Sequence, residues 1–173
     1  MPQERTGVVT FKGKPMTLIG PALKPGDKAP DFSALGAGLT PVNLASSKGK
    51  VRLFSVVPSL DTPVCSIQTK RFNGELAALP AGVQSYTVSC DLPFAQARFC
   101  GSEKIERMAT ISDHRDVSFG TAFGVLIKEL RLLTRSIFVV DAKDHIAYVQ
   151  IVPEITSEPN YAEALEAVRK AAK

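Results

Sequence analysis

The sequence has no long apolar run and few cysteines, and each shortage excludes a class of protein. No stretch approaches the ~18 apolar residues that a membrane span needs, and residues 1–7 contain no apolar segment typical of a signal peptide. Three cysteines in 173 residues are few for a structural disulfide framework. We therefore expect a cytoplasmic protein that binds no membrane and whose thiols are either reactive or simply buried.

Metal and nucleic-acid sites also lack support. The only two histidines, His114 and His145, form neither a C-x-x-H nor an H-x-x-x-H spacing, so we expect no metal site and place both residues in loops or at the surface. The net charge of +4 comes from 21 Lys and Arg against 17 Asp and Glu, scattered without a basic run. Such scattering is typical of a mixed solvated surface and not of a nucleic-acid interface.

Apolar residues make up 45% of the chain, which is enough to bury one core. We expect a single domain over residues 1–173. Near its start, residues 8–11 and 16–19 flank a Gly-containing turn, which predicts a β-hairpin within an N-terminal extension at 1–22.

Strand and helix patterns alternate through the rest of the chain. Residues 51–57 predict a strand, 63–79 a helix and 83–88 a second strand, which together predict a βαβ unit. Further predicted elements are strands at 136–141 and 146–152 and a closing helix at 161–171. This order predicts an α/β fold with a mixed central sheet flanked by helices on both faces.

Cys65 lies at the expected start of the first helix. Proline is favoured in the first helical turn, so we expect Pro63 at position N1 and Thr62 as the N-cap, which places Cys65 at N3. Unpaired N–H groups and the helix dipole favour a negative sulfur there, and the thiolate is the nucleophilic form of cysteine. The Thr62 hydroxyl could cap the helix or contact the sulfur or a substrate oxygen, and the sequence leaves this open.

A structural role for Cys65 fits the same residues. Cys65 shares one helical face with Phe72 and Leu76, and cysteine is among the most often buried residue types, so spacing alone slightly favours burial. The position after a buried strand, the T-P-x-C helix start and a second cysteine downstream together favour a reactive thiol. That second cysteine, Cys100, follows 35 residues later in a predicted turn and short helix, with Gly101 beyond the helix end.

Two other cysteine chemistries find less support. A thioredoxin-type disulfide oxidoreductase uses a C-x-x-C pair, but Cys65 is followed by Ser66, Ile67 and Gln68. A cysteine hydrolase needs a histidine base held near the thiol, and both histidines stand in unremarkable segments. A non-enzymatic redox sensor fits the same motifs and differs from an enzyme only in turnover.

Three motifs resemble those of a known family. They are P-S-L-D-T-P-V-C at 58–65, D-L-P-F-A-Q-A-R-F-C-G at 91–101 and E-I-T-S-E-P-N-Y at 154–161, and they resemble bacterial thiol peroxidases, which are atypical two-cysteine peroxiredoxins. The resemblance spans nearly the whole chain. It implies a thioredoxin-like fold, a homodimer, no cofactor, and reduction of hydrogen peroxide and organic hydroperoxides with electrons from thioredoxin.

The resemblance also implies residue roles. Cys65 matches the peroxidatic cysteine, Pro58 and Thr62 match the P-x-x-x-T-x-x-C pocket signature, Cys100 matches the resolving cysteine, and Arg135 matches the active-site arginine. The implied cycle oxidises Cys65 to a sulfenic acid, which condenses with Cys100 into an intrachain disulfide that thioredoxin reopens. Without the resemblance, Arg135 would be interpreted as a surface charge.

Two further expectations concern the other cysteine and the motion. Cys90 matches neither redox position, and we expect it to be a buried small hydrophobe. Because a thiolate in a helical first turn is not expected to meet a thiol on another helix, the implied cycle predicts local unwinding around both redox cysteines. Gly74 and Gly101 are the expected points of slack.

Overall fold

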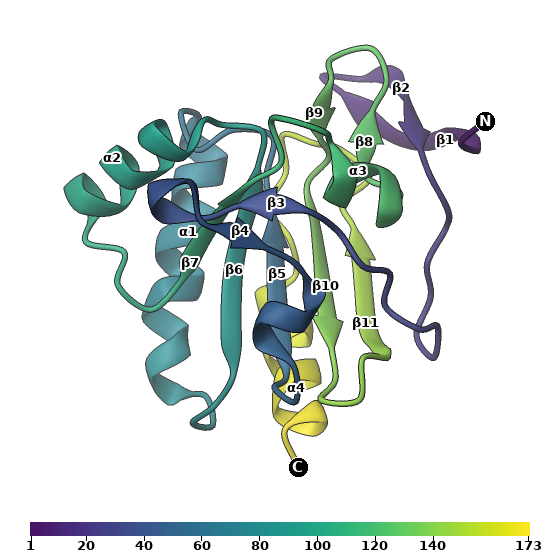
Figure 1. Cartoon of the computed structure of the whole chain (residues 1–173). Coiled ribbons are helices and arrows are strands. Elements are labelled where there is room, and N and C mark those ends of the chain that lie inside the picture. Colours follow the sequence, from purple (N-terminus) through teal and green to yellow (C-terminus); the bar gives the residue numbers. More distant parts are fainter.

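The computed structural model describes residues 1–173 and contains two sheets, as Figure 1 shows. The larger has the strand order β11-β10-β5-β6-β7-β3-β4, and the smaller has the order β1-β2-β8-β9. The strands are β1 Glu4–Phe11, β2 Lys14–Ile19, β3 Ala34–Leu35, β4 Pro41–Val42, β5 Arg52–Val56, β6 Gln84–Ser89, β7 Ala109–Ser112, β8 Leu126–Ile127, β9 Leu132–Leu133, β10 Ser136–Val140 and β11 Ile146–Ile151. The helices are α1 Pro63–Glu75, α2 Pro93–Glu103, α3 Ser118–Ala122 and α4 Tyr161–Ala171, with short 3-10 turns η1 Ala37–Leu39, η2 Leu44–Ser47 and η3 Leu76–Ala78. None of the helices has the length and apolar content required to span a bilayer.

The predicted βαβ unit is present. Strand β5 runs parallel to β6, and β10 pairs antiparallel with both β5 and β11, so the larger sheet is mixed as expected. Successive side chains of a strand point to opposite faces. Leu53 of β5 accordingly packs in a different core cluster from Phe54, and both side chains are fully buried.

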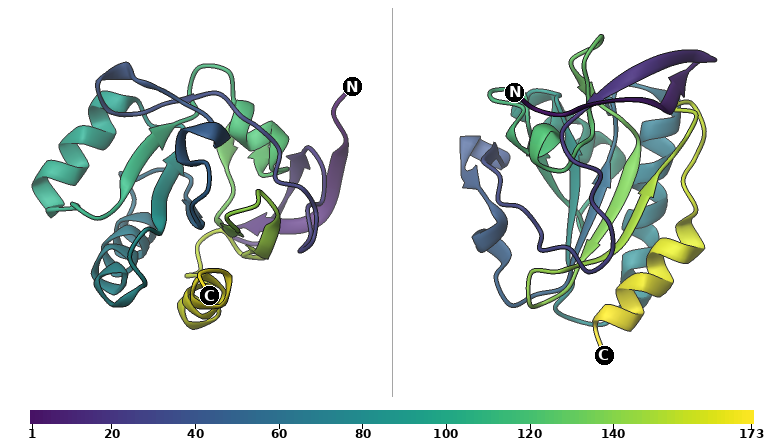
Figure 2. Two further views of the ribbon diagram at one scale, coloured as in Figure 1. Left: turned by 60° about the horizontal axis from the view of Figure 1, so that its bottom comes forward. Right: turned by 90° about the vertical axis from the view of Figure 1, so that its right-hand side faces the viewer.

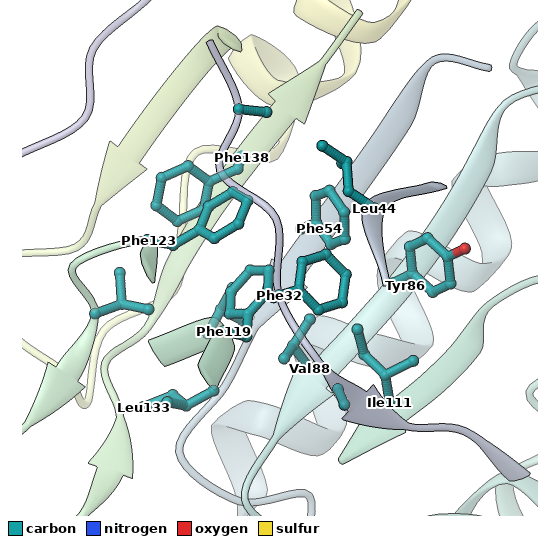
Figure 3. Packing of buried hydrophobic residues seen from close by; sticks show 14 of the residues in the cluster. Phe32, Leu44, Phe54, Tyr86, Val88, Ile111, Phe119, Phe123, Leu133 and Phe138 are labelled. Carbon is teal, nitrogen blue, oxygen red and sulfur yellow. The ribbon is translucent and has the colours of Figure 1, made fainter. Parts of the chain in front are cut away.

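Helices cover both faces of this sheet. Helices α1 and α4 lie on one face (Figure 2). Phe72 and Leu165 of these helices pack there with Leu53. The other face carries α3 and the phenylalanine cluster, in which Phe119 and Phe123 stack with ring centroids 4.2 Å apart. The phenylalanines of this cluster are Phe32, Phe54, Phe119, Phe123 and Phe138 (Figure 3). Helix α2 contacts β7 and η1. The sheet thereby holds the starts of α1 and α2 next to the carboxyl ends of β5 and β6.

The N-terminal hairpin is part of the smaller sheet. Its turn lies at Lys12 and Gly13 as predicted, but β2 also pairs with β8, and β8 pairs with β9. Arg5 on β1 donates hydrogen bonds to the carbonyl oxygens of Gly20 and Gly124. Strands β8 and β9 are therefore the partner strands of the hairpin, and residues 128–131 between them are exposed.

Two helix ends differ from the predictions. Helix α1 ends at Glu75 and is followed by the 3-10 turn η3, so the α-helix is shorter than 63–79. Gly101 lies inside α2, and the prediction that it follows the helix end is wrong. Lys104 takes the left-handed conformation that terminates α2, with φ 55°, and its N–H donates to the carbonyl oxygen of Cys100.

Candidate active site

The register of α1 is the predicted one. Thr62 is the extended N-cap residue, Pro63 is the first helical residue, and Cys65 stands in the third position. The Thr62 hydroxyl does not cap the helix, because it donates to the carbonyl oxygen of Ser59 at 2.9 Å. Cys65 is fully buried in a small apolar cluster that includes Leu60. The alternative interpretation of Cys65 as a buried residue therefore describes its packing correctly.

Arg135 meets this buried thiol. Its Nη2 donates to the Sγ of Cys65 at 3.3 Å, and its side chain is itself buried, with 2% exposed. The interpretation of Arg135 as a surface charge is therefore wrong. Two more hydrogen bonds fix the guanidinium, from Nη1 to Oε1 of Gln68 and from Nε to the carbonyl oxygen of Ile155, both at 2.8 Å.

The partners of Arg135 leave its positive charge uncompensated. Both oxygen acceptors are neutral, and Arg135 forms no ion pair with a carboxylate. A guanidinium remains charged at any working pH, and a charge held in a buried site acts strongly on a nearby sulfur. The structure therefore places a buried positive charge within hydrogen-bond distance of the Cys65 sulfur.

Gln68 is a site residue that the sequence analysis missed. It is buried one helical turn after Cys65, and its Nε2 donates to the Oγ of Ser55 on β5 at 2.7 Å, so its Oε1 is free to accept from Arg135. Residues three apart on a helix share a face, and this spacing from Cys65 is the signal that could have identified Gln68.

A surface cavity of about 850 Å³ lies next to the start of α1. Thr62, Pro63 and Ser66 line one side, and residues of α2 that include Phe94 and Arg98 line the other. Cys65 is not part of the lining. The cavity thus lies beside the helix turn that carries the thiol. Pro58 lies in the loop between β5 and α1 and is half-buried.

The structure does not bring Cys65 and Cys100 into a bond. All three cysteines are free thiols. Cys100 is half-buried on α2 and packs against the core cluster under α1 and α4, whereas Cys65 belongs to the cluster with Leu60. Phe99 packs against both clusters. Burial raises the pKa of the Cys100 thiol, so the position of Cys100 in this structure favours its protonated form.

Cys90 has an environment unsuited to a reactive thiol. It is half-buried, not fully buried as predicted, and packs against the phenylalanine cluster. Burial, with the nearby carboxylates of Asp113 and Asp91, raises the pKa of Cys90 to about 12. A thiol with this pKa is almost wholly protonated at neutral pH.

Comparison with known proteins places this geometry in a family. The Redoxin family model matches residues 24–165. The thiol peroxidase of Halalkalibacterium halodurans is 56% identical over 163 residues, which are 94% of this chain and 98% of the relative. The thiol peroxidase of Bacillus subtilis is 55% identical over 161 residues, which are 93% of this chain and 96% of that protein. The chain belongs to the thiol peroxidases of the Redoxin family.

Membership of the thiol peroxidases settles the fold. A crystal structure of a peroxiredoxin-like protein from Aquifex aeolicus superposes with a TM-score of 0.88 at 45% identity, covering 96% of this chain and 97% of that one. The larger sheet with its flanking helices is therefore a thioredoxin-like fold of the peroxiredoxin type. The protein is a peroxiredoxin peroxidase, an oxidoreductase.

Proposed function

We propose that this thiol peroxidase reduces hydrogen peroxide and organic hydroperoxides to water and alcohols, with Cys65 as the peroxidatic thiol. The Cys65 thiolate attacks one peroxide oxygen, the O–O bond breaks, and the second oxygen leaves with a proton as water or alcohol, so that Cys65 becomes a sulfenic acid. The contact of 3.3 Å between Arg135 and the Cys65 sulfur carries this proposal. The guanidinium stabilises both the thiolate and the charge that develops on oxygen.

Thr62 and Pro58 take supporting roles in this proposal. The Thr62 hydroxyl lies on the wall of the cavity beside Cys65, where it can exchange its bond to Ser59 for one to a peroxide oxygen. Pro58 restricts the backbone of the loop that leads from β5 to α1.

The second half of the proposed cycle regenerates the thiol. The sulfenic acid of Cys65 condenses with the thiol of Cys100, forming an intrachain S–S bond and releasing water, and thioredoxin then reduces the disulfide. A disulfide requires Cα atoms ~4.4 to 6.8 Å apart. The two cysteines lie in different clusters with Phe99 packed against both, so we propose that α1 around Cys65 and the last turn of α2 around Cys100 unwind locally during each cycle. We further propose that the protein works as a cytoplasmic homodimer.

Steady-state turnover tests the proposed function. With thioredoxin, thioredoxin reductase and NADPH in excess, we expect many molecules of NADPH oxidised per protein molecule for each hydroperoxide, and none with Cys65→Ser. Cys100→Ser should leave the first oxidation intact and abolish recycling. A redox sensor, the second candidate, would consume one equivalent of peroxide without recycling, and that result in the unmodified chain would contradict the proposal.

A further inference from the structure

Asp91 lies between the segments that carry the two redox cysteines. Its Oδ1 accepts from the Oγ of Ser59 at 2.7 Å, and its Oδ2 accepts from the backbone N–H of Leu60 and from the Oγ of Ser89, each at 2.7 Å. Ser59 and Leu60 belong to the loop before α1, and Leu60 packs directly with Cys65. The carboxylate thus holds the loop on which the position of the Cys65 thiol depends.

The same network continues into α2. The Oγ of Ser89 accepts from Nε2 of Gln96 at 3.0 Å, and this Nε2 also donates to the carbonyl oxygen of Ile111 at 2.9 Å. Gln96 is buried and lies one helical turn before Cys100. Its Oε1 has no hydrogen-bond partner, so only these two donated bonds orient the amide. A continuous chain of contacts therefore runs from Leu60 through Asp91 and Ser89 to the helix of Cys100.

We propose that Asp91 is a positioning residue that favours peroxide reduction over disulfide formation. With its hydrogen bonds intact, the loop before α1 stays packed on Cys65 and α2 stays docked, which is the arrangement in which Arg135 contacts the sulfur. Hydrogen bonds to a charged acceptor are stronger than neutral ones, so this carboxylate opposes separation of the two segments. Asp91 therefore limits the rate at which Cys100 reaches oxidised Cys65.

The inference rests on the proposed function, because it assumes that oxidised Cys65 forms a disulfide with Cys100. In that step the Cys65 sulfur gains a bond to the Cys100 sulfur and loses its bond to oxygen, which leaves as water with the thiol proton. Opening before this step must loosen the contacts that hold the loop, α2 or both. Asp91 is the residue whose side chain reaches the loop directly and α2 through Ser89.

Asp91→Asn should change the rate of Cys65 oxidation and the rate of disulfide formation in opposite directions. The amide keeps the size of the side chain but offers one oxygen in place of two, so at least one donor loses its acceptor. Loss of one hydrogen bond to a charged group corresponds to about a tenfold change in an equilibrium. We expect disulfide formation to become about tenfold faster and the oxidation of Cys65 by hydrogen peroxide about tenfold slower.

The experiment measures both steps in the full chain. Oxidation of Cys65 by hydrogen peroxide is followed by stopped flow with Cys100→Ser present, and disulfide formation is followed by acid quench and mass after one equivalent of peroxide with Cys100 intact. Asp31→Asn is the matched control, because Oδ1 of Asp31 accepts from the backbone N–H groups of Phe32 and Leu44, which lie in the phenylalanine cluster. The control should change neither rate by more than about twofold.

A second variant covers the case in which Asp91→Asn does not fold. Ser89→Ala removes the link from Asp91 to Gln96 but leaves the carboxylate on Ser59 and Leu60, so disulfide formation should again accelerate. A folded variant whose rate of disulfide formation is unchanged or slower overturns the inference. The inference is also overturned if Cys65 oxidation and disulfide formation slow equally and in proportion to a decrease in Tm. If the unmodified chain forms no Cys65–Cys100 bridge, the proposed function fails before any variant is compared, and the inference fails with it.

Discussion

At the scale of single residues, the site depends on a buried charge beside a buried thiol. The sequence predicts the position of Cys65 well, because Thr62 and Pro63 fix the helix start through local backbone chemistry. It does not predict Arg135 without the family resemblance. The contacts of Arg135 with Cys65 and Gln68 join residues about 70 positions apart, and no local pattern encodes such a contact.

Replacement of Arg135 tests its role. Arg135→Met keeps much of the side-chain volume but removes the charge and the donor to Cys65, so we expect the rate constant for oxidation of Cys65 by peroxide to fall about 10²- to 10³-fold. Stopped-flow measurement on the folded variant checks this result. Arg169→Met on the exposed face of α4 is the control and should retain the full rate. A fall of less than about threefold with Arg135→Met would show that the guanidinium is not needed.

At the scale of elements, the proposed disulfide step depends on α2, which carries the half-buried Cys100. The sequence predicts this helix but misplaces its end, since Gly101 is typical of a helix end and here lies in the last helical turn. A side chain at Gly101 would meet nothing within 4 Å, so tight packing does not explain the glycine. The left-handed Lys104 ends the helix in its place.

The protonation of Cys100 predicts a pH dependence. Burial raises the pKa of Cys100 while α2 is packed against the protein. The packed state is therefore fully favoured below the ordinary thiol pKa of about 8.5, and it loses stability relative to the opened state as pH rises above that value. Opening exposes the thiol and restores its ordinary pKa, and the thiolate is the attacking form. We expect the rate of disulfide formation to increase nearly tenfold from about pH 7 to 8 and to level off above about pH 9. A rate independent of pH, measured by quench and mass, would exclude a titrating Cys100.

At the scale of the whole molecule, long-range strand pairing is what the sequence leaves undetermined. The hairpin of β1 and β2 is predicted from its turn and alternation, but its pairing with β8 joins positions more than a hundred residues apart. Gly20 and Gly124 allow this approach: a Cβ at Gly124, where φ is +69°, would lie 1.9 Å from the carbonyl oxygen of Pro21. The closing helix α4, whose pattern is local, matches its predicted bounds 161–171.

Gly124→Ala tests the importance of this contact for stability. The positive φ and the clash with backbone atoms together should lower the free energy of unfolding by about 3 kcal/mol, which corresponds to a decrease in Tm of roughly 10 °C. Gly74→Ala in α1 is the matched control, because a Cβ there meets nothing within 4 Å and alanine favours the helix, so its Tm should stay equal or rise. Equal Tm values for the two variants would contradict this account of the hairpin.

The most direct test of the account is non-reducing peptide mapping by mass after one equivalent of hydrogen peroxide. The proposed chemistry predicts one intrachain bridge between the peptides of Cys65 and Cys100, with the Cys90 peptide recovered as a free thiol, in keeping with its raised pKa of about 12. A bridge that contains Cys90, or a Cys65 oxidised without any bridge to Cys100, would contradict the account.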